Sequence, residues 1–253
     1  MLKVRVVPVL LLKEGRMIKT KRFRFFKDTG DPLKTVNVYD AQGADELVIL
    51  DISATVEGRN QWLDLISESA KQCFIPITVG GGITSVDGAR RAFMAGADRV
   101  TVVTRAVEDP DFIGRLAESF GRANVVVCID AKLDDEGIYK VSTYSATRLS
   151  DKDVVCWAIE AAERGAGELL LHFTDRDGMM CGYDLTLLKA VADAVDVPVM
   201  ALGGVGTLQD LVDGVIEGTA SAVGAASIFH FTDQSPIKAH SYMHGKGIPV
   251  CIA

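Results

Sequence analysis

The sequence has no hydrophobic run long enough to span a membrane, and its cysteines form no CxxC pair. The apolar N-terminal segment 1–15 is too short to cross a bilayer, and no small-residue cleavage site follows it, so we interpret it as a buried strand. The scattered cysteines show no clustering with histidine at metal-ligand spacing. We therefore expect a cytoplasmic protein with reduced thiols, no metal and no cofactor. The cysteines are Cys73, Cys128, Cys156, Cys181 and Cys251.

An excess of basic residues is also missing. The 27 Lys and Arg residues are outnumbered by 34 Asp and Glu residues, which gives a net charge of −7. This balance argues against a nucleic acid or an anionic membrane surface as the main partner. The chain also has no linker or low-complexity segment, and its 253 residues match the length of one barrel domain.

Short apolar runs rich in β-branched residues alternate with amphipathic stretches along the whole chain. Nearly continuous apolar runs are typical of parallel strands that are buried on both faces. Eight such alternations favour a single α/β domain, a (β/α)8 TIM barrel spanning 1–253. The predicted strands are 4–12, 47–52, 76–79, 98–103, 124–130, 168–172, 197–202 and 220–224, and the predicted helices include 59–72, 85–96, 110–120, 152–165, 184–195 and 208–217.

The chain repeats itself at an offset of 122 residues. Segment 76–100 aligns with 198–222 without a gap, and the alignment matches Gly81 with Gly203 and Gly82 with Gly204. The same offset pairs Glu46 with Glu168. We interpret the chain as two pseudo-symmetric half-barrels, about 1–122 and 123–253, because chance similarity of barrel strands rarely preserves glycine positions.

Glycine-rich loops follow two of the predicted strands. In a barrel of this type the ligand site lies at the C-terminal ends of the strands, and backbone N–H groups without a neighbouring Cβ can close on an anion. A short helix after the last strand would add a favourable N-terminus. Such loops also serve plain tight turns, but two of them on opposite sides suggest a long phosphorylated ligand with an anionic group at each end. The candidate phosphate-binding residues are Gly81, Gly82, Thr104, Gly203, Gly204, Ala226 and Ser227.

Asp130 ends the fifth predicted strand and is the candidate catalytic residue. A partly desolvated carboxylate at this place can act as a general acid or base. Its half-barrel counterpart is Leu11, so one of two opposed positions carries a hydrocarbon. The C-terminal ends of the strands form the mouth of the barrel. A purely structural role stays open for every polar residue there, because carboxylates at the mouth often cap loops or pair with lysines. A lone histidine is as often a packed side chain as a base. The other polar candidates near the mouth are Lys19, Asp51, His172 and Asp177.

Four charged residues lie at or near strand starts, at the opposite end of the barrel. Arg5, Glu46, Arg99 and Glu168 provide two positive and two negative groups that could form an ion-pair ring. We call this end of the barrel its floor. From the residues alone, such a ring is either a plug that stabilises the floor or a gate.

The combined motifs resemble the cyclase subunit of imidazole glycerol phosphate synthase, the HisF family, across nearly the whole chain. This resemblance implies a half-barrel-duplicated lyase of histidine biosynthesis. Such a lyase binds a bisphosphate ribonucleotide and takes ammonia from a glutaminase docked at the barrel floor. It also implies that Arg5, Glu46, Arg99 and Glu168 form the ammonia gate and that Asp98 lies at the glutaminase interface. The matching segments are 5–19, 30–32, 44–54, 75–83, 125–132, 165–171, 175–184, 203–208 and 225–231.

The departures from the family are concentrated at the mouth. The catalytic aspartates of the family correspond to positions 11 and 130, and only Asp130 is kept. Losing one of two cooperating proton-transfer groups costs on the order of 10²–10⁴ in rate. The family usually has lysine where this chain has Arg99. Further residues that differ from those usual in the family are Val103, His172, Met179 and Leu202.

Segment 9–20, VLLLKEGRMIKT, resembles a HisF-like branch that accompanies surface-polysaccharide genes. That resemblance implies a subunit that conducts ammonia from a HisH-like glutaminase, for a separate sugar amidotransferase that amidates a polysaccharide sugar. This is our leading hypothesis. The alternatives are a working cyclase, in which another group replaces the lost aspartate, and a non-catalytic phosphosugar-binding barrel.

Overall fold

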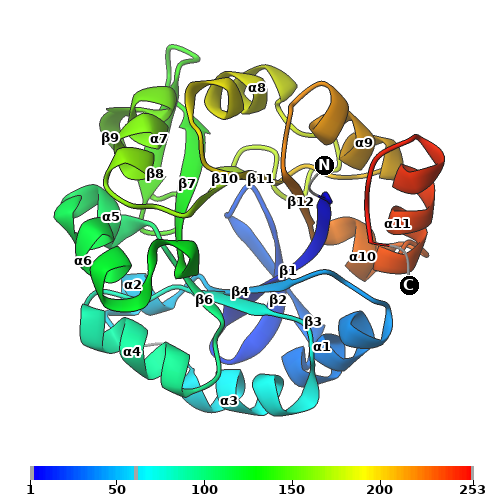
Figure 1. The fold of residues 1–253 in the computed structure, drawn as a ribbon, viewed down its shortest axis with the longest axis horizontal. Coiled ribbons are helices and arrows are strands. Elements are labelled where there is room, and N and C mark those ends of the chain that lie inside the picture. The colour runs from blue at the N-terminus through cyan, green and yellow to red at the C-terminus, as the bar shows by residue number, and fades with distance from the viewer. Residues whose placement is uncertain (1–2, 60–61, 252–253) are drawn as a thin grey trace.

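The computed structural model describes residues 3–59 and 62–251. Parallel strands pair side by side, and β10 pairs with β7, so the sheet closes on itself. Figure 1 shows the strands at the centre with the helices arranged around them. The predicted (β/α)8 barrel is confirmed. Its strands are β1 (Arg5–Lys13), β4 (Leu47–Asp51), β5 (Ile77–Gly80), β6 (Arg99–Val102), β7 (Val125–Leu133), β10 (Glu168–Phe173), β11 (Val199–Leu202) and β12 (Ala222–Ala225).

Helices follow the barrel strands, and their ends differ from the predicted ends by a few residues. The largest difference is the predicted helix 59–72, which begins at Leu63, while residues 60–61 lie outside the described part of the chain. None of the described helices has the length and apolar character needed to cross a membrane. The helices are α1 (Pro32–Ala41), α2 (Ala54–Glu57), α3 (Leu63–Gln72), α4 (Val86–Met94), α5 (Thr104–Glu108), α6 (Asp111–Phe120), η1 (Arg122–Asn124), α7 (Val154–Glu163), α8 (Leu185–Ala194), α9 (Leu208–Ile216), α10 (Ser227–Phe231) and α11 (Pro236–Gly245).

Two antiparallel ribbons extend the barrel at its mouth. The two longest barrel strands, β1 and β7, have nine residues each and continue into β2 (Arg16–Lys21) with β3 (Phe25–Gly30) and into β8 (Tyr139–Thr143) with β9 (Arg148–Asp153). The sequence did not indicate these ribbons, because β3 and β9 carry mainly polar or exposed side chains. One ribbon follows β1 and the other follows β7, the first barrel strand of each predicted half. The division into half-barrels stays a prediction.

Alternation along β1 decides which side chains enter the barrel. Val7, Val9 and Leu11 belong to the apolar cluster inside the barrel, whereas Val6 and Leu10 belong to the larger core that includes the helices. This is the period of two expected of a strand with both faces buried. Leu11 therefore faces the interior at the mouth end, as the sequence analysis expected.

Candidate functional site

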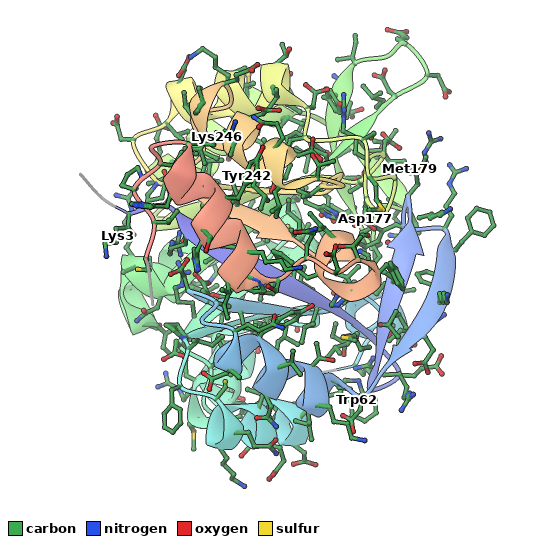
Figure 2. All side chains as sticks on the ribbon, turned by 90° about the vertical axis from the view of Figure 1, so that its right-hand side faces the viewer. Lys3, Trp62, Asp177, Met179, Tyr242 and Lys246 are labelled. Carbon is green, nitrogen blue, oxygen red and sulfur yellow. The ribbon has the colours of Figure 1, made fainter. Side chains whose placement is uncertain are left out.

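The barrel has two chemically different ends. Figure 2 shows Lys3 at one end and Asp177 with Met179 at the other, where the strands finish. At this mouth a cavity of about 60 Å³ lies over the ends of β4, β5, β6, β7 and β10. Its lining is Phe23, Leu50, Asp51, Ile52, Thr55, Gly81, Thr101, Val103, Thr104, Cys128, Asp130, Ser145 and His172.

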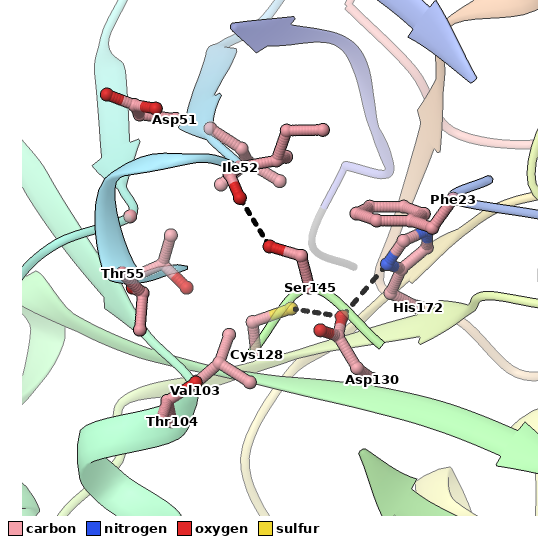
Figure 3. Close-up of a pocket in the computed structure, with 13 residues that line it drawn as sticks. Phe23, Asp51, Ile52, Thr55, Val103, Thr104, Cys128, Asp130, Ser145 and His172 are labelled. Carbon is pink, nitrogen blue, oxygen red and sulfur yellow. Dashed lines mark hydrogen bonds and ion pairs between the residues drawn. The ribbon is translucent and has the colours of Figure 1, made fainter. Parts of the chain in front are cut away.

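Asp130 and His172 form the central polar pair of this cavity. Nδ1 of His172 lies 2.9 Å from Oδ1 of Asp130, and the Cys128 thiol donates to the same oxygen at 3.6 Å (Figure 3). The pair is deeply buried, with 6% of Asp130 and 1% of His172 exposed. Burial raises the pKa of the Cys128 thiol, and the charge of Asp130 raises it further, so the sulfur keeps its proton and remains a donor.

Leu11 lies where the resemblance implies a second carboxylate. Its side chain is 3% exposed and belongs to an apolar cluster with Ile18 and Leu202, against which Leu50 packs. An alkyl group can neither donate nor accept a proton. The mouth therefore has one of the two implied carboxylates.

Lys19 and Asp177 meet above the pair. Nζ of Lys19 lies 3.6 Å from Oδ1 of Asp177, and the hydroxyl of Thr20 donates to Oδ2. The backbone N–H of Arg22 donates to the Asp177 carbonyl at 2.9 Å. These contacts fasten the ribbon β2–β3 over the mouth.

Phe23, at the turn of this ribbon, lines the cavity from above. Its ring lies against that of His172 at an interplanar angle of 56°, with 5.0 Å between ring centroids (Figure 3). The sequence did not indicate this aromatic contact, because it joins a turn to a strand that follows far along the chain.

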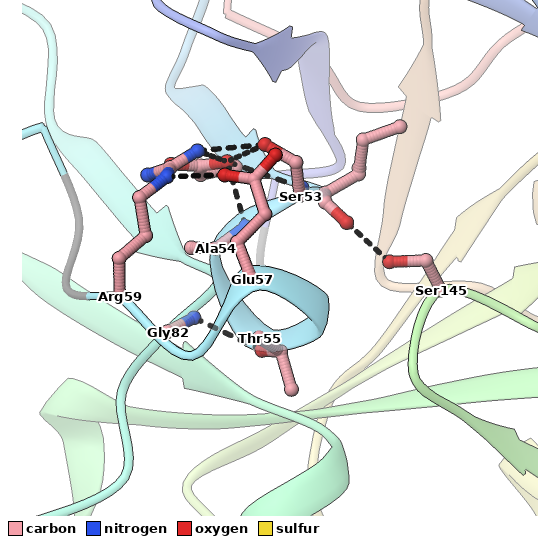
Figure 4. A network of polar contacts seen from close by, with 9 residues as sticks. Ser53, Ala54, Thr55, Glu57, Arg59, Gly82 and Ser145 are labelled. Carbon is pink, nitrogen blue, oxygen red and sulfur yellow. Dashed lines mark hydrogen bonds and ion pairs between the residues drawn. The ribbon is translucent and has the colours of Figure 1, made fainter.

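Asp51 lies at the mouth but is held by its own loop. It pairs with Arg59 at 2.5 Å and accepts hydrogen bonds from the backbone N–H groups of Ser53 and Ala54 (Figure 4). The sequence did not indicate Arg59, because it stood at the start of a predicted helix. A carboxylate with this many donors anchors the loop after β4.

The first glycine loop lies beside the central cavity. Gly81 has φ +90°, and a Cβ there would come within 2.0 Å of the Asp51 carbonyl oxygen, so only glycine fits. The N–H of Gly82 donates to the Thr55 hydroxyl at 3.2 Å (Figure 4), and Thr104 accepts from the N–H of Tyr144 at 3.0 Å. A neighbouring cavity of about 130 Å³ is lined by residues that include Thr55, Gly81, Gly82, Thr104 and Tyr144.

The second glycine loop has the same requirement on the other side of the mouth. Gly203 and Gly204 have φ +101° and +106°, and a Cβ on Gly204 would lie 2.1 Å from the carbonyl oxygen of Gly182. Ala226 caps α10, which begins at Ser227, as predicted. Ser227 also lines a cavity of about 280 Å³ whose lining includes three lysines, Lys19, Lys21 and Lys27.

At the floor, the four predicted charges form one closed ring. Arg5 pairs with Glu46 at 2.5 Å and also with Glu168, and Arg99 pairs with both carboxylates. Glu46 and Glu168 are 1% and 3% exposed, and the Thr78 hydroxyl donates to Glu46 at 2.5 Å. Burial alone would lower the pKa of Arg99, but the charges of Glu46 and Glu168 outweigh it and raise the pKa.

Asp98 lies on the same floor. Its side chain is exposed and accepts from the N–H of Ile77 at 2.8 Å. Beside it, a hollow of about 640 Å³ is lined by residues that include Lys3, Arg5 and Arg99. Among residues 3–59 and 62–251, no three His, Cys, Asp or Glu side chains are grouped so as to hold a metal ion.

Comparison with known proteins places the chain in a family. The model of the family described as "Histidine biosynthesis protein" matches residues 5–235. The imidazole glycerol phosphate synthase subunit HisF of Caulobacter vibrioides strain NA1000 / CB15N is 50% identical over 251 residues, which cover 99% of this chain and 96% of the relative. The HisF subunit of strain ATCC 19089 / CIP 103742 / CB 15 shows the same identity and coverage. The chain belongs to the HisF family of histidine biosynthesis proteins.

Proposed function

We propose that this chain is the synthase-type subunit of a glutamine-dependent amidotransferase, which receives ammonia at the barrel floor and uses or delivers it at the mouth. One observation carries the proposal: a single barrel joins a ring of buried charges at one end to the buried Asp130–His172 pair at the other. Arg5, Glu46, Arg99 and Glu168 are the proposed gate. Asp98, exposed beside them, is the proposed contact with a HisH-type glutaminase.

The two glycine loops support a phosphorylated ligand. We assign Gly81, Gly82 and Thr104 to one phosphate, and Gly203, Gly204, Ala226 and Ser227 to another. Both loops require glycine for steric reasons, and the cavity beside Ser227 is lined by lysines. Two separated anion sites suit a ligand with a phosphate at each end, such as a bisphosphate ribonucleotide.

Two reactions compete at the mouth. The relatives are imidazole glycerol phosphate synthase subunits, which favours a lyase that closes the ring of the histidine-pathway ribonucleotide. Leu11 favours the other reaction, in which ammonia leaves the mouth for a separate sugar amidotransferase that amidates a surface-polysaccharide sugar. A non-catalytic phosphosugar-binding barrel is the third possibility, and ligand binding without any ammonia-dependent reaction would distinguish it.

The proposed docking of a glutaminase at the barrel floor is tested by mixing the chain with its cognate glutaminase. We expect a complex in size-exclusion chromatography and stimulated hydrolysis of glutamine, because the exposed Asp98 and the charged ring offer a polar docking face. Asp98→Lys should weaken the complex at least tenfold by reversing a rim charge. Asp87→Lys, a matched reversal at the exposed start of α4, should leave it unchanged. Absence of any complex with the wild-type chain would overturn the proposal.

The first phosphate site is tested with Gly81→Ala. A Cβ at this position would lie 2.0 Å from the Asp51 carbonyl oxygen, so the loop must move, and we expect phosphate affinity to fall about tenfold or more. Gly245→Ala is the control, because a Cβ there meets no atom within 4 Å. Calorimetric titration with inorganic phosphate measures both, and circular dichroism checks the fold. Equal affinities in the two variants would remove Gly81 from the site.

The lost carboxylate is tested with Leu11→Asp. If the rest of the mouth supports ring closure, we expect this variant to gain ammonia-dependent cyclase turnover, by as much as the order of 10²–10⁴ that a proton-transfer group contributes. Leu11→Asn is the control, because it is polar and of similar size but cannot exchange a proton. Turnover is measured with ammonium chloride and the bisphosphate ribonucleotide. No gain, in a chain whose wild type also shows no turnover, would mean that the mouth has diverged beyond this position and would favour the sugar-amidation reaction.

A further inference from the structure

His172 has one ring nitrogen that is paired and one that is not. Nδ1 faces Asp130, whereas Nε2 is buried and has no hydrogen-bond partner among the described residues. Buried polar atoms in folded proteins nearly always have a partner, and an exception calls for an explanation. The His172 side chain also lines the mouth cavity, so the unpaired nitrogen belongs to a residue that a ligand there would meet.

The contacts of Asp130 fix the tautomer of this ring. Oδ1 of Asp130 receives the Cys128 thiol at 3.6 Å and faces Nδ1 of His172 at 2.9 Å. Oδ1 of Asp130 is the acceptor in the contact with the thiol, and we take it to be the acceptor in the contact with Nδ1 as well. Nδ1 is then the donor and carries the hydrogen. In the neutral ring, Nε2 then carries a free lone pair and is a proton acceptor.

Charged groups around the ring would stabilise it after it accepts a proton. Asp130 on β7 lies on one side, and Oδ1 of Asp177, from the loop after β10, lies 4.0 Å from Nε2 on the other. Lys19 on β2 faces the same oxygen of Asp177 and partly offsets its charge. The neighbouring strand β11 places Leu202 beside His172 and brings no charge. Phe23 covers the ring from the β2–β3 ribbon.

We propose that His172 is the proton acceptor of the mouth, with Asp130 as the carboxylate that orients it, in place of the carboxylate pair that Leu11 interrupts. This rests on the proposed function, in which ammonia reaches the mouth. The ammonia lone pair forms a bond to a carbonyl-type carbon of the phosphorylated ligand, and the carbonyl π pair moves onto its oxygen. The nitrogen, now positively charged, loses one proton to Nε2. The imidazolium that results lies between the carboxylates of Asp130 and Asp177.

The ring itself is tested by nuclear magnetic resonance on histidine-¹⁵N-labelled protein. We expect the neutral His172 ring to carry its hydrogen on Nδ1, the minor form of free histidine, with the signal assigned by its loss in His172→Gln. His244→Gln, at an exposed position near the end of α11, is the matched control and should leave this signal in place. A hydrogen found on Nε2 would overturn the proposal.

Proton transfer is tested by kinetics with ammonium chloride and the bisphosphate ribonucleotide. Gln at position 172 keeps an amide that can face Asp130 but cannot take up a proton. We expect His172→Gln to lower kcat by about 10²–10⁴ and to abolish one limb of the pH profile, while His244→Gln keeps both. An unchanged kcat and profile would overturn the proposal.

The NMR and kinetic measurements together distinguish two outcomes: one in which His172 has no role in proton transfer, and one in which the proposed function itself is wrong. A wild-type chain with the Nδ1–H ring and no ammonia-dependent turnover would contradict both the ring-closure reaction and proton transfer from ammonia, and would leave only the Asp130–His172 pairing. Turnover that is unaffected by the substitution would contradict the role of His172 alone.

Discussion

The ion-pair ring at the barrel floor is the interaction on which the rest of this account depends. Two carboxylates, Glu46 and Glu168, are almost wholly buried there, and isolated charges at such depth are costly. Each is paired with both Arg5 and Arg99, so removing one partner would leave a buried charge without compensation. The ring is thus expensive to break, and it ties together residues at the starts of four barrel strands.

Between this ring and the mouth, the barrel interior is lined mainly by hydrocarbon. Val7, Val9, Val48, Val126 and Leu170 belong to one apolar cluster that ends at Leu11 and Leu202. An apolar lining disfavours ammonium far more than neutral ammonia, because a charge loses its hydration there. If ammonia crosses the barrel as proposed, this lining would favour neutral ammonia, the form whose lone pair can attack carbon, on the way to Asp130 and His172.

The sequence was sufficient for features that repeat along the chain. The offset of 122 residues paired Glu46 with Glu168 in the ring, and the correspondence of the first strand with the fifth placed Leu11 opposite Asp130. It was insufficient where the contact joins distant irregular segments. Thr20 meets Asp177 across 157 positions, and the turn residue Phe23 reaches His172 on β10, so neither contact leaves a local pattern. His172 was predicted near the mouth, but its pairing with Asp130 depends on the neighbouring register of β7 and β10.

The central claim, that ammonia passes through the barrel from floor to mouth, is tested most directly by isotope competition. The wild-type chain, its glutaminase and the phosphorylated acceptor are incubated with amide-¹⁵N glutamine in a large excess of unlabelled ammonium, and mass spectrometry follows the nitrogen in the product. The account predicts product enriched in ¹⁵N far above its share of the total ammonia, because the label does not mix with the solvent. Product with the isotope ratio of the bulk solution would contradict it.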